Sequence, residues 1–178
     1  GGAFTFNASK LKLTGGNHGL IAALGPIIIL ENVLVENNTS TGIKIRASVG
    51  VVKDSTIQNN GSHAIQVDYS GAAGIEGNTI SGHTSGSSIK ITYGSSADIY
   101  KNTITNGEKA GIDVDRGSFA RIGNSPDNGV SRGNIVQSAY HGISVEDSSH
   151  AILKYNTFQS NSKKGLKIAN NASVILAE

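Results

Sequence analysis

One short sequence pattern recurs from end to end of the chain, and this repeat constrains the fold more than any other feature. Each copy opens with a small residue, followed by a branched apolar, a variable, an apolar and a variable residue. The opening residues are Gly19, Gly42, Ala64, Ser88, Gly111, Gly142 and Gly165. The steps between them are 23, 22, 24, 23, 31 and 23 residues. Such a period indicates a repeat protein in which each copy forms one unit of a stacked array.

Every repeat contains three short apolar segments. In the repeat that opens at Gly42 they lie at 43–46, 49–52 and 55–58, and Gly, Asn, Ser or Asp separates one from the next. The segments alternate apolar and polar residues, and no window keeps a 3.6-residue period over about ten residues. The sequence therefore predicts three short strands per repeat, joined by turns.

Equivalent strands of successive repeats are expected to stack about 4.8 Å apart and to wind a coil with a continuous core. The first strand of each repeat points these residues inward: Ile43, Ile45, Ile65, Val67, Ile89, Ile91, Ile112, Val114, Ile143, Val145, Leu166 and Ile168. It points these residues outward: Lys44, Arg46, Gln66, Asp68, Lys90, Thr92, Asp113, Asp115, Ser144, Glu146 and Lys167. Outward residues of neighbouring turns should then form files along the coil.

The long step of 31 residues predicts a loop insertion at about 123–133. The distance from the last apolar residue of a repeat to the next opening residue stays at 7, both for Ile104 to Gly111 and for Ile135 to Gly142. The extra residues therefore lie earlier in that turn. From its length and its unbroken repeat, the chain is expected to form one domain, residues 1–178.

A recurring Asn-Thr-Ile segment predicts a buried asparagine ladder at one corner of the coil. Asn tolerates left-handed backbone, and its amide both donates to and accepts from the amide one turn away. The expected members are Asn32, Asn78, Asn102 and Asn156, with Ser55 replacing one of them.

This arrangement resembles the right-handed parallel β-helix of the pectate-lyase-like superfamily, with repeats of the Gly-Ile-x-Val…Ala-x-Ile-x-x-Asn-x-Ile kind, over essentially the whole chain. The resemblance implies an all-β fold: a single-stranded right-handed parallel β-helix, or β-solenoid, of about seven to eight coils with three short strands each. It says little about activity, because the superfamily contains lyases, hydrolases, epimerases, tailspikes, adhesins and noncatalytic proteins. The Asp-Pro-His-Glu motif of alginate epimerases and the motif set of polygalacturonases are both missing.

Composition excludes several functional classes. The chain has no Cys, which removes disulfides and thiol chemistry, and no apolar run approaches the roughly 18 residues of a membrane span. The net charge is only +2, and the one basic cluster, Lys163, Lys164 and Lys167, fits a solvated face better than nucleic-acid binding. The sequence starts without an initiator Met, which we expect to reflect either a removed secretion signal or a cut from a longer protein. The low charge, the polar composition and the resemblance described above favour a secreted or cell-surface protein.

Two carboxylates of one outward file are candidate catalytic residues. Asp115 and Glu146 should be neighbours on adjacent turns with β-carbons about 5 Å apart, and Asp113 lies on the same strand. Such a pair can split its pKa values and act as acid and base in a polysaccharide lyase or glycoside hydrolase. Apart from Arg116, no Arg or Lys is expected beside the pair in the manner of a lyase base. The competing interpretations are a solvated acidic patch and, with Asp113, a calcium site; no other metal or cofactor is expected.

The adjacent file contains Tyr69, Tyr93, Arg116 and Asp147 on successive turns. Two tyrosines and a guanidinium make a platform on which a sugar ring can lie, or simply a stacked ladder that stabilises the coil. With the neighbouring carboxylates, the candidate carbohydrate-binding residues are Tyr69, Tyr93, Asp68, Asp113 and Arg116. His18, His63 and His141 precede repeat openings but lie two and three turns apart, too far to share a metal ion.

Neither end of the sequence shows an evident capping segment. The apolar residues expected at the two ends are Phe4, Phe6, Leu11, Leu13, Val174, Ile175 and Leu176. Unpaired strand edges are templates for pairing, so we expect either continuation of a longer coil or end-to-end self-association. The favoured function is a noncatalytic extracellular structural or adhesive β-solenoid. The alternative is a carbohydrate-active module that uses the outward face of the first strand.

Overall fold

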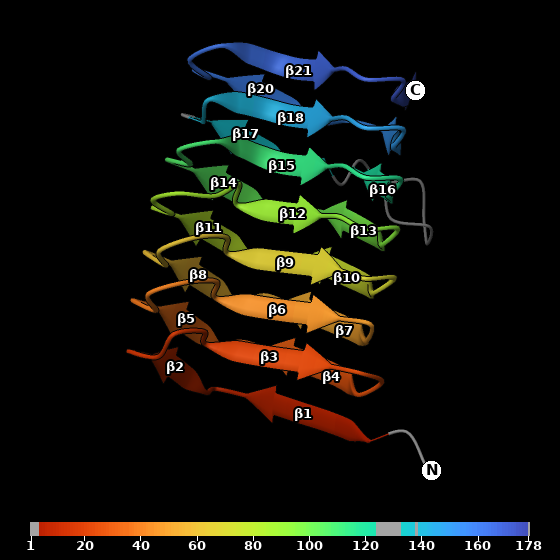
Figure 1. Cartoon of the computed structure of the whole chain (residues 1–178). Coiled ribbons are helices and arrows are strands. Elements are labelled where there is room, and N and C mark those ends of the chain that lie inside the picture. Colours follow the sequence, from red (N-terminus) through yellow and green to blue (C-terminus); the bar gives the residue numbers. More distant parts are fainter. Residues whose placement is uncertain (1–3, 124–132, 138, 178) are drawn as a thin grey trace.

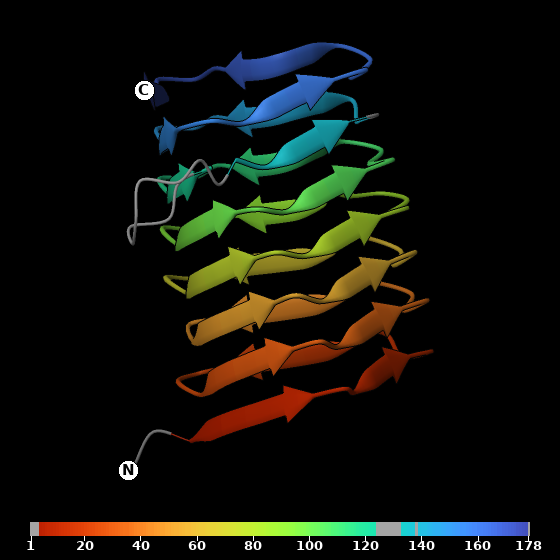
Figure 2. The ribbon, with the colours of Figure 1, turned by 180° about the vertical axis from the view of Figure 1, so that it is seen from behind.

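The structure, a computed structural model, describes residues 4–123, 133–137 and 139–177. These residues form 22 β-strands and no helix, so the described chain has no helix that spans a membrane. The strands wind a right-handed coil in which each turn adds one strand to each of three parallel sheets (Figures 1 and 2). The predicted fold class, a parallel β-solenoid with three strands per coil, is confirmed.

The three sheets are numbered here by the order of their strands within a repeat. Sheet 1 contains β3 (Leu20–Ala23), β6 (Ile43–Arg46), β9 (Ile65–Asp68), β12 (Ile89–Ile91), β15 (Ala110–Val114), β18 (His141–Val145) and β21 (Lys164–Ile168). Sheet 2 contains β1 (Thr5–Ser9), β4 (Ile27–Glu31), β7 (Val49–Lys53), β10 (Ala72–Glu76), β13 (Ser96–Tyr100), β16 (Phe119–Ile122), β19 (His150–Leu153) and β22 (Ser173–Leu176). Sheet 3 contains β2 (Lys12–Thr14), β5 (Leu34–Glu36), β8 (Thr56–Gln58), β11 (Thr79–Ser81), β14 (Thr103–Thr105), β17 (Ile135–Gln137) and β20 (Thr157–Gln159).

The core is a set of stacked apolar files that run along the coil axis. Ile89 pairs with Ile112, and Ile112 with Ile143, so identical side chains lie one above the other as predicted. The predicted inward residues from Ile43 to Val145 are all completely buried. Ile168 is half exposed because its strand is the last of sheet 1 and no turn covers it. The hydrophobic effect thus fixes the register of each strand on its neighbour.

The predicted insertion falls between β16 and β17, and these strands keep their register on neighbouring turns. Of the predicted segment 123–133, residues 124–132 lie outside the described residues.

The corner between sheets 2 and 3 contains a ladder of one hydroxyl and four amides, all buried except the partly exposed Asn156. The side-chain oxygen of each member accepts from the backbone N–H of the member one turn before, at 2.9 to 3.1 Å. The members are Ser55, Asn78, Asn102, Asn134 and Asn156. The prediction was right for Ser55 and three asparagines, omitted Asn134 and was wrong for Asn32. Leu34 pairs with Thr56, so Val33 takes the ladder position, while Asn32 lies one residue earlier with φ of 54°.

Candidate functional site

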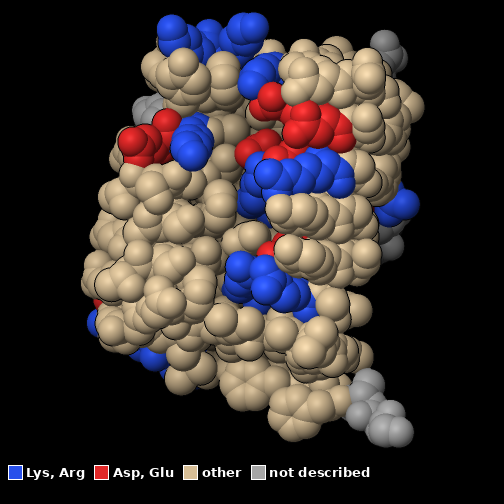
Figure 3. Space-filling view, viewed as in Figure 1, with Lys and Arg blue, Asp and Glu red and all other residues tan. Residues whose placement is uncertain are grey.

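The outer face of sheet 1 carries most of the chemically active side chains that the sequence singled out. The register places these residues in one file along the axis: Ala23, Arg46, Asp68, Thr92, Asp115, Glu146 and Ala169. Beside it runs a second file: Ile21, Lys44, Gln66, Lys90, Asp113, Ser144 and Lys167. Figure 3 shows basic and acidic side chains alternating along this face, next to a largely uncharged surface. Opposite charges on successive turns therefore face one another.

The predicted pair, Asp115 and Glu146, lies on adjacent turns, but each carboxylate is bound to a lysine. Lys90 Nζ lies 2.6 Å from Asp115 and 2.6 Å from Asp113. Lys167 Nζ lies 2.7 Å from Glu146, which also accepts a hydrogen bond from Ser144 Oγ at 2.6 Å. The expectation that no lysine stands beside the pair is wrong. Lys90 lies directly one turn before Asp113, and its side chain is long enough to reach both aspartates.

These contacts fix the charge states of the groups. Burial alone would raise the pKa of Glu146, but hydrogen bonds from Lys167 and Ser144 outweigh it and lower that pKa. Burial alone would lower the pKa of Lys90, but Asp113 and Asp115 outweigh it and raise that pKa. The carboxylate stays ionised and the ammonium stays protonated near neutral pH. Both pKa values are shifted away from neutral pH, whereas the pKa of a general acid or base is shifted toward it.

Asp68 is the most deeply buried carboxylate of this face, with a side chain only 1% exposed. The Arg46 guanidinium donates to its two oxygens at 3.1 and 2.9 Å, and the Gln66 amide donates at 3.1 Å. Lys44 Nζ lies 3.6 Å away. The fork of the guanidinium matches the carboxylate, so this ion pair joins two turns of the coil.

The predicted tyrosine file is a continuous stack. The Tyr69 and Tyr93 rings lie 4.7 Å apart and 15° from parallel. The Arg46 guanidinium lies 4.6 Å from the centre of the Tyr69 ring, and Arg116 lies 4.5 Å from that of Tyr93. Each ring therefore has neighbours on both faces, although the residues remain 49% and 42% exposed. Only the ring edges and hydroxyls are open to a ligand. The stacked ladder that was the alternative interpretation is therefore present, and sugar binding at this file stays a prediction.

The three candidate histidines lie in one file, two and three turns apart as expected. Within the described ranges, no group of three or more His, Asp or Glu side chains is placed to hold a metal ion. Calcium binding by Asp113, Asp115 and Glu146 stays a prediction.

Comparison with known proteins identifies the family. A family model described as a right-handed beta helix region matches residues 2–178. The chain belongs to the right-handed β-helix family. No curated protein matches it. A solved structure described as the Agl-KA catalytic domain is similar over 98% of this chain and 53% of its own, at 11% identity and a TM-score of 0.46. This β-helix thus spans about half the length of that structure, and so distant a likeness carries no argument about activity.

The ends of the β-helix expose apolar side chains unequally. Phe4 and Phe6 are exposed at the N-terminal end, where they help to line a hollow of about 410 Å³. Leu176 is exposed at the other end, but Ile175 belongs to the outer side of sheet 2, because it pairs with Ile152 in an outward file. The remaining predicted end residues pack partly against the core: Leu11, Leu13 and Val174. End-to-end pairing stays a prediction.

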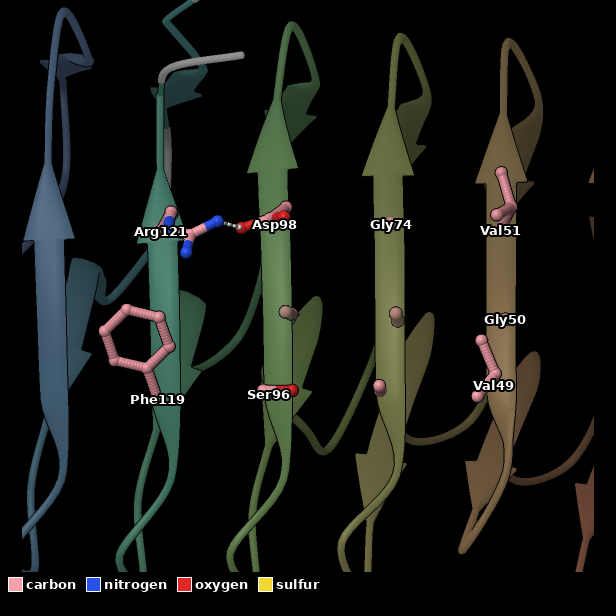
Figure 4. A pocket seen from close by; sticks show the side chains of 11 residues that line it. Val49, Gly50, Val51, Gly74, Ser96, Asp98, Phe119 and Arg121 are labelled. Carbon is pink, nitrogen blue, oxygen red and sulfur yellow. Dashed lines mark hydrogen bonds and ion pairs between the residues drawn. The ribbon is translucent and has the colours of Figure 1, made fainter. Parts of the chain in front are cut away.

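Sequence reasoning missed a hollow of about 340 Å³ on the outer face of sheet 2. It arises where four successive turns of the β-helix carry large, small, small and large outward residues (Figure 4). Val49 and Val51 form one wall, Ala72 and Gly74 part of the floor, and β16 the other wall. The signal was present in the sequence, since β10 begins with three small residues, Ala72, Ala73 and Gly74.

Proposed function

We propose that the chain is a noncatalytic structural or adhesive β-solenoid of the cell exterior. The observation that carries the proposal is the pairing of the outward carboxylates of sheet 1. Asp68 is bound by Arg46, Asp113 and Asp115 by Lys90, and Glu146 by Lys167. Paired charges that bridge turns stabilise a rod, whereas acid and base catalysts need pKa values displaced toward neutrality.

The proposal extends to localisation and assembly. The extracellular location is supported by the low net charge and by the abundance of Asn, Ser, Thr and Gly in the sequence. β1 and β22 are the outermost strands of sheet 2, and each has one free edge. Such an edge can pair with a further turn of a longer coil or with a second copy. Sedimentation velocity and negative-stain microscopy over a concentration series distinguish filaments from monomers.

The experiment that tests the noncatalytic assignment is a product assay. Purified protein is incubated with acidic and neutral polysaccharides, and new reducing ends and unsaturated uronates are measured over days. We expect no product. Product formation that Asp115→Asn or Glu146→Gln abolishes, with the melting temperature unchanged, would overturn the assignment.

The second candidate is a carbohydrate-active module on sheet 1. It is favoured by the exposed edges of Tyr69 and Tyr93 beside Asp68, Asp113 and Arg116. Under this function, Tyr93→Ala would weaken the binding of an acidic oligosaccharide, whereas the structural function predicts a loss of stability only.

A further inference from the structure

We propose that the hollow on sheet 2 is a binding site for a neutral oligosaccharide. This inference rests on the proposed adhesive role and gives it a ligand and a location. The hollow is formed by β7, β10, β13 and β16, whose strands are paired in continuous register. Four strands span about 14 Å along the axis, at about 4.8 Å per turn. Its volume of about 340 Å³ falls within the range of small-molecule sites.

The shape of the hollow comes directly from the register. One outward file reads Val49, Ala72, Ser96 and Phe119 from turn to turn, and the other reads Val51, Gly74, Asp98 and Arg121. A Cβ built on Gly74 would meet nothing closer than Val51 Cγ2 at 4.0 Å. The floor is thus open space above a flat strand, and it is not a gap that the core needs for packing.

One wall of the hollow is apolar. Val49 and Val51 are 49% and 37% exposed, and Ile29 of the preceding turn continues the branched apolar surface. Clusters of exposed branched side chains on a sheet face are unfavourable in water unless something covers them for part of the time. A ligand with carbon–hydrogen surface would bury this wall.

The opposite wall combines an aromatic ring with two charged groups. Figure 4 shows the Phe119 ring broadside, lying against the outer face of the sheet. The ring of His150, one turn further along, lies 5.7 Å away and within 13° of the same orientation. The two rings are stacked, as the tyrosines are, and Phe119 is only partly exposed. The exposed part of the Phe119 ring therefore adds apolar surface to this wall for a pyranose to contact.

Asp98 and Arg121 supply the polar contacts. Among the described residues they share one long hydrogen bond of 3.4 Å, and both side chains are exposed. The Arg121 guanidinium also lies 5.8 Å from the centre of the Phe119 ring. A guanidinium has five N–H donors and a carboxylate accepts several hydrogen bonds, so most of this hydrogen-bonding capacity is open to hydroxyl groups. Ser96 adds an exposed hydroxyl at the edge of the hollow.

The charges argue against other classes of ligand. Asp98 and Arg121 cancel, so the hollow does not attract the phosphates of a nucleic acid or the carboxylates of an acidic glycan. An added peptide strand pairs with a free sheet edge, whereas the backbone of these strands already pairs on both sides. A neutral sugar matches both features, because it has apolar ring faces and hydroxyls that donate and accept.

The test is a titration of the whole chain with cellohexaose, xylohexaose and laminarihexaose, followed by calorimetry, with tri-galacturonate as the acidic comparison. We expect one of the neutral probes to bind and tri-galacturonate not to bind. Gly74→Phe fills the hollow and should weaken binding at least about tenfold, and Phe119→Ala should also weaken it by removing apolar surface from one wall.

The matched control is Thr79→Phe, which places the same ring on sheet 3 of the same turn, at an exposed position of β11. It should leave affinity unchanged, and melting temperatures check that all variants fold. The inference fails if no neutral probe binds at millimolar concentration, or if Gly74→Phe binds as tightly as the unmodified chain. No binding together with no product would leave the structural function intact, whereas binding lost only in Tyr93→Ala would favour sheet 1.

Discussion

The outer faces of sheets 1 and 2 are built by the same repeat, yet they use their side chains in opposite ways. On sheet 1, Asp115 and Lys90 bond to each other across turns, and the Tyr69 and Tyr93 rings stack on neighbours. On sheet 2, Asp98 and Arg121 share only a long contact at the rim of a hollow. On sheet 1 of this β-helix, charged residues of the same or neighbouring files therefore pair with each other, and the hollow lies on sheet 2, where the outward side chains are small.

The largest difference in stability should appear between variants of two glycines, one on each of these sheets. A Cβ on Gly111 of sheet 1 would lie 2.2 Å from Val136 Cγ1 in the core, whereas Gly74 of sheet 2 faces open space. We expect Gly111→Val to lower the free energy of unfolding by more than about 3 kcal/mol, because overpacking displaces core atoms. Gly74→Val should be neutral or slightly stabilising, since Val favours strands. Urea unfolding of both variants checks this, and equal losses would contradict it.

A buried histidine tests the same distinction between satisfied and unsatisfied polar groups inside the coil. Asn38 and Asn60 bond to each other at the corner between sheets 3 and 1. His83, at the equivalent position of the next turn, faces the backbone of Ile57 and Asn60, but within the described chain neither of its ring nitrogens makes a hydrogen bond of good geometry. Burial lowers the pKa of His83 from 6.5 to about 4. The folded state therefore favours the neutral form of the His83 ring.

The sign of the pH effect follows from that lowered pKa. The stability that depends on neutral His83 is complete above the unfolded pKa of 6.5 and is lost as the pH falls toward about 4. The loss should total about 3 kcal/mol. His83→Asn should remove it, measured as the difference between variant and unmodified chain in urea unfolding at pH 7 and pH 4. A difference that does not change with pH would contradict the assignment.

Asp68 on sheet 1 and Asp98 on sheet 2 should give a smaller difference in stability when each is replaced by alanine. Asp68→Ala on sheet 1 leaves Arg46 and Lys44 without their buried partner, and we expect a loss of about 2 kcal/mol. Asp98→Ala on sheet 2 removes an exposed pair and should cost less than about 0.5 kcal/mol. Thermal unfolding of both variants at low and high salt measures the contrast, and a larger loss for Asp98→Ala would refute it.

The smallest contrast is between the costs of one sheet 1 variant, at Glu146, at two pH values. Its pKa is lowered from the ordinary value of 4.5 in the folded state, so its stabilising contribution is present above pH 4.5 and is lost as the pH falls through the folded pKa. Glu146→Gln should cost less than about 1 kcal/mol at pH 7 and almost nothing at pH 3. Chemical unfolding at both values measures this, and a constant cost would show that packing outweighs the charge.

Most of the fold was predictable because the same pattern of strand and turn residues recurs in every repeat. The spacing of Gly42, Gly111 and their equivalents fixed the rung length, and the alternation around Ile112 fixed which side chains point inward. The error at Asn32 came from a one-residue difference at a corner, where the backbone is left-handed. Only the pairing of Leu34 with Thr56 reveals it.

The candidate site was less predictable. The register of the strands tells which residues share a file, but not which atoms a long side chain contacts. The alignment of Lys90 with Asp113 was readable from the sequence, but the bond from Lys90 to Asp115 depends on how a long flexible side chain is placed. The hollow was missed for the opposite reason. Ala72 and Gly74 carry no functional groups, so a search for chemically active residues passes over them.

The most direct test of the contrast is a heteronuclear NMR titration of the labelled chain with the neutral hexasaccharide that binds best. If the open site lies on sheet 2 and the polar groups of sheet 1 are already paired, amide chemical shifts should change around Gly74, Asp98 and Phe119 and stay constant on sheet 1. Changes centred on Asp113, Asp115 and Glu146, with the sheet 2 amides unmoved, would contradict it.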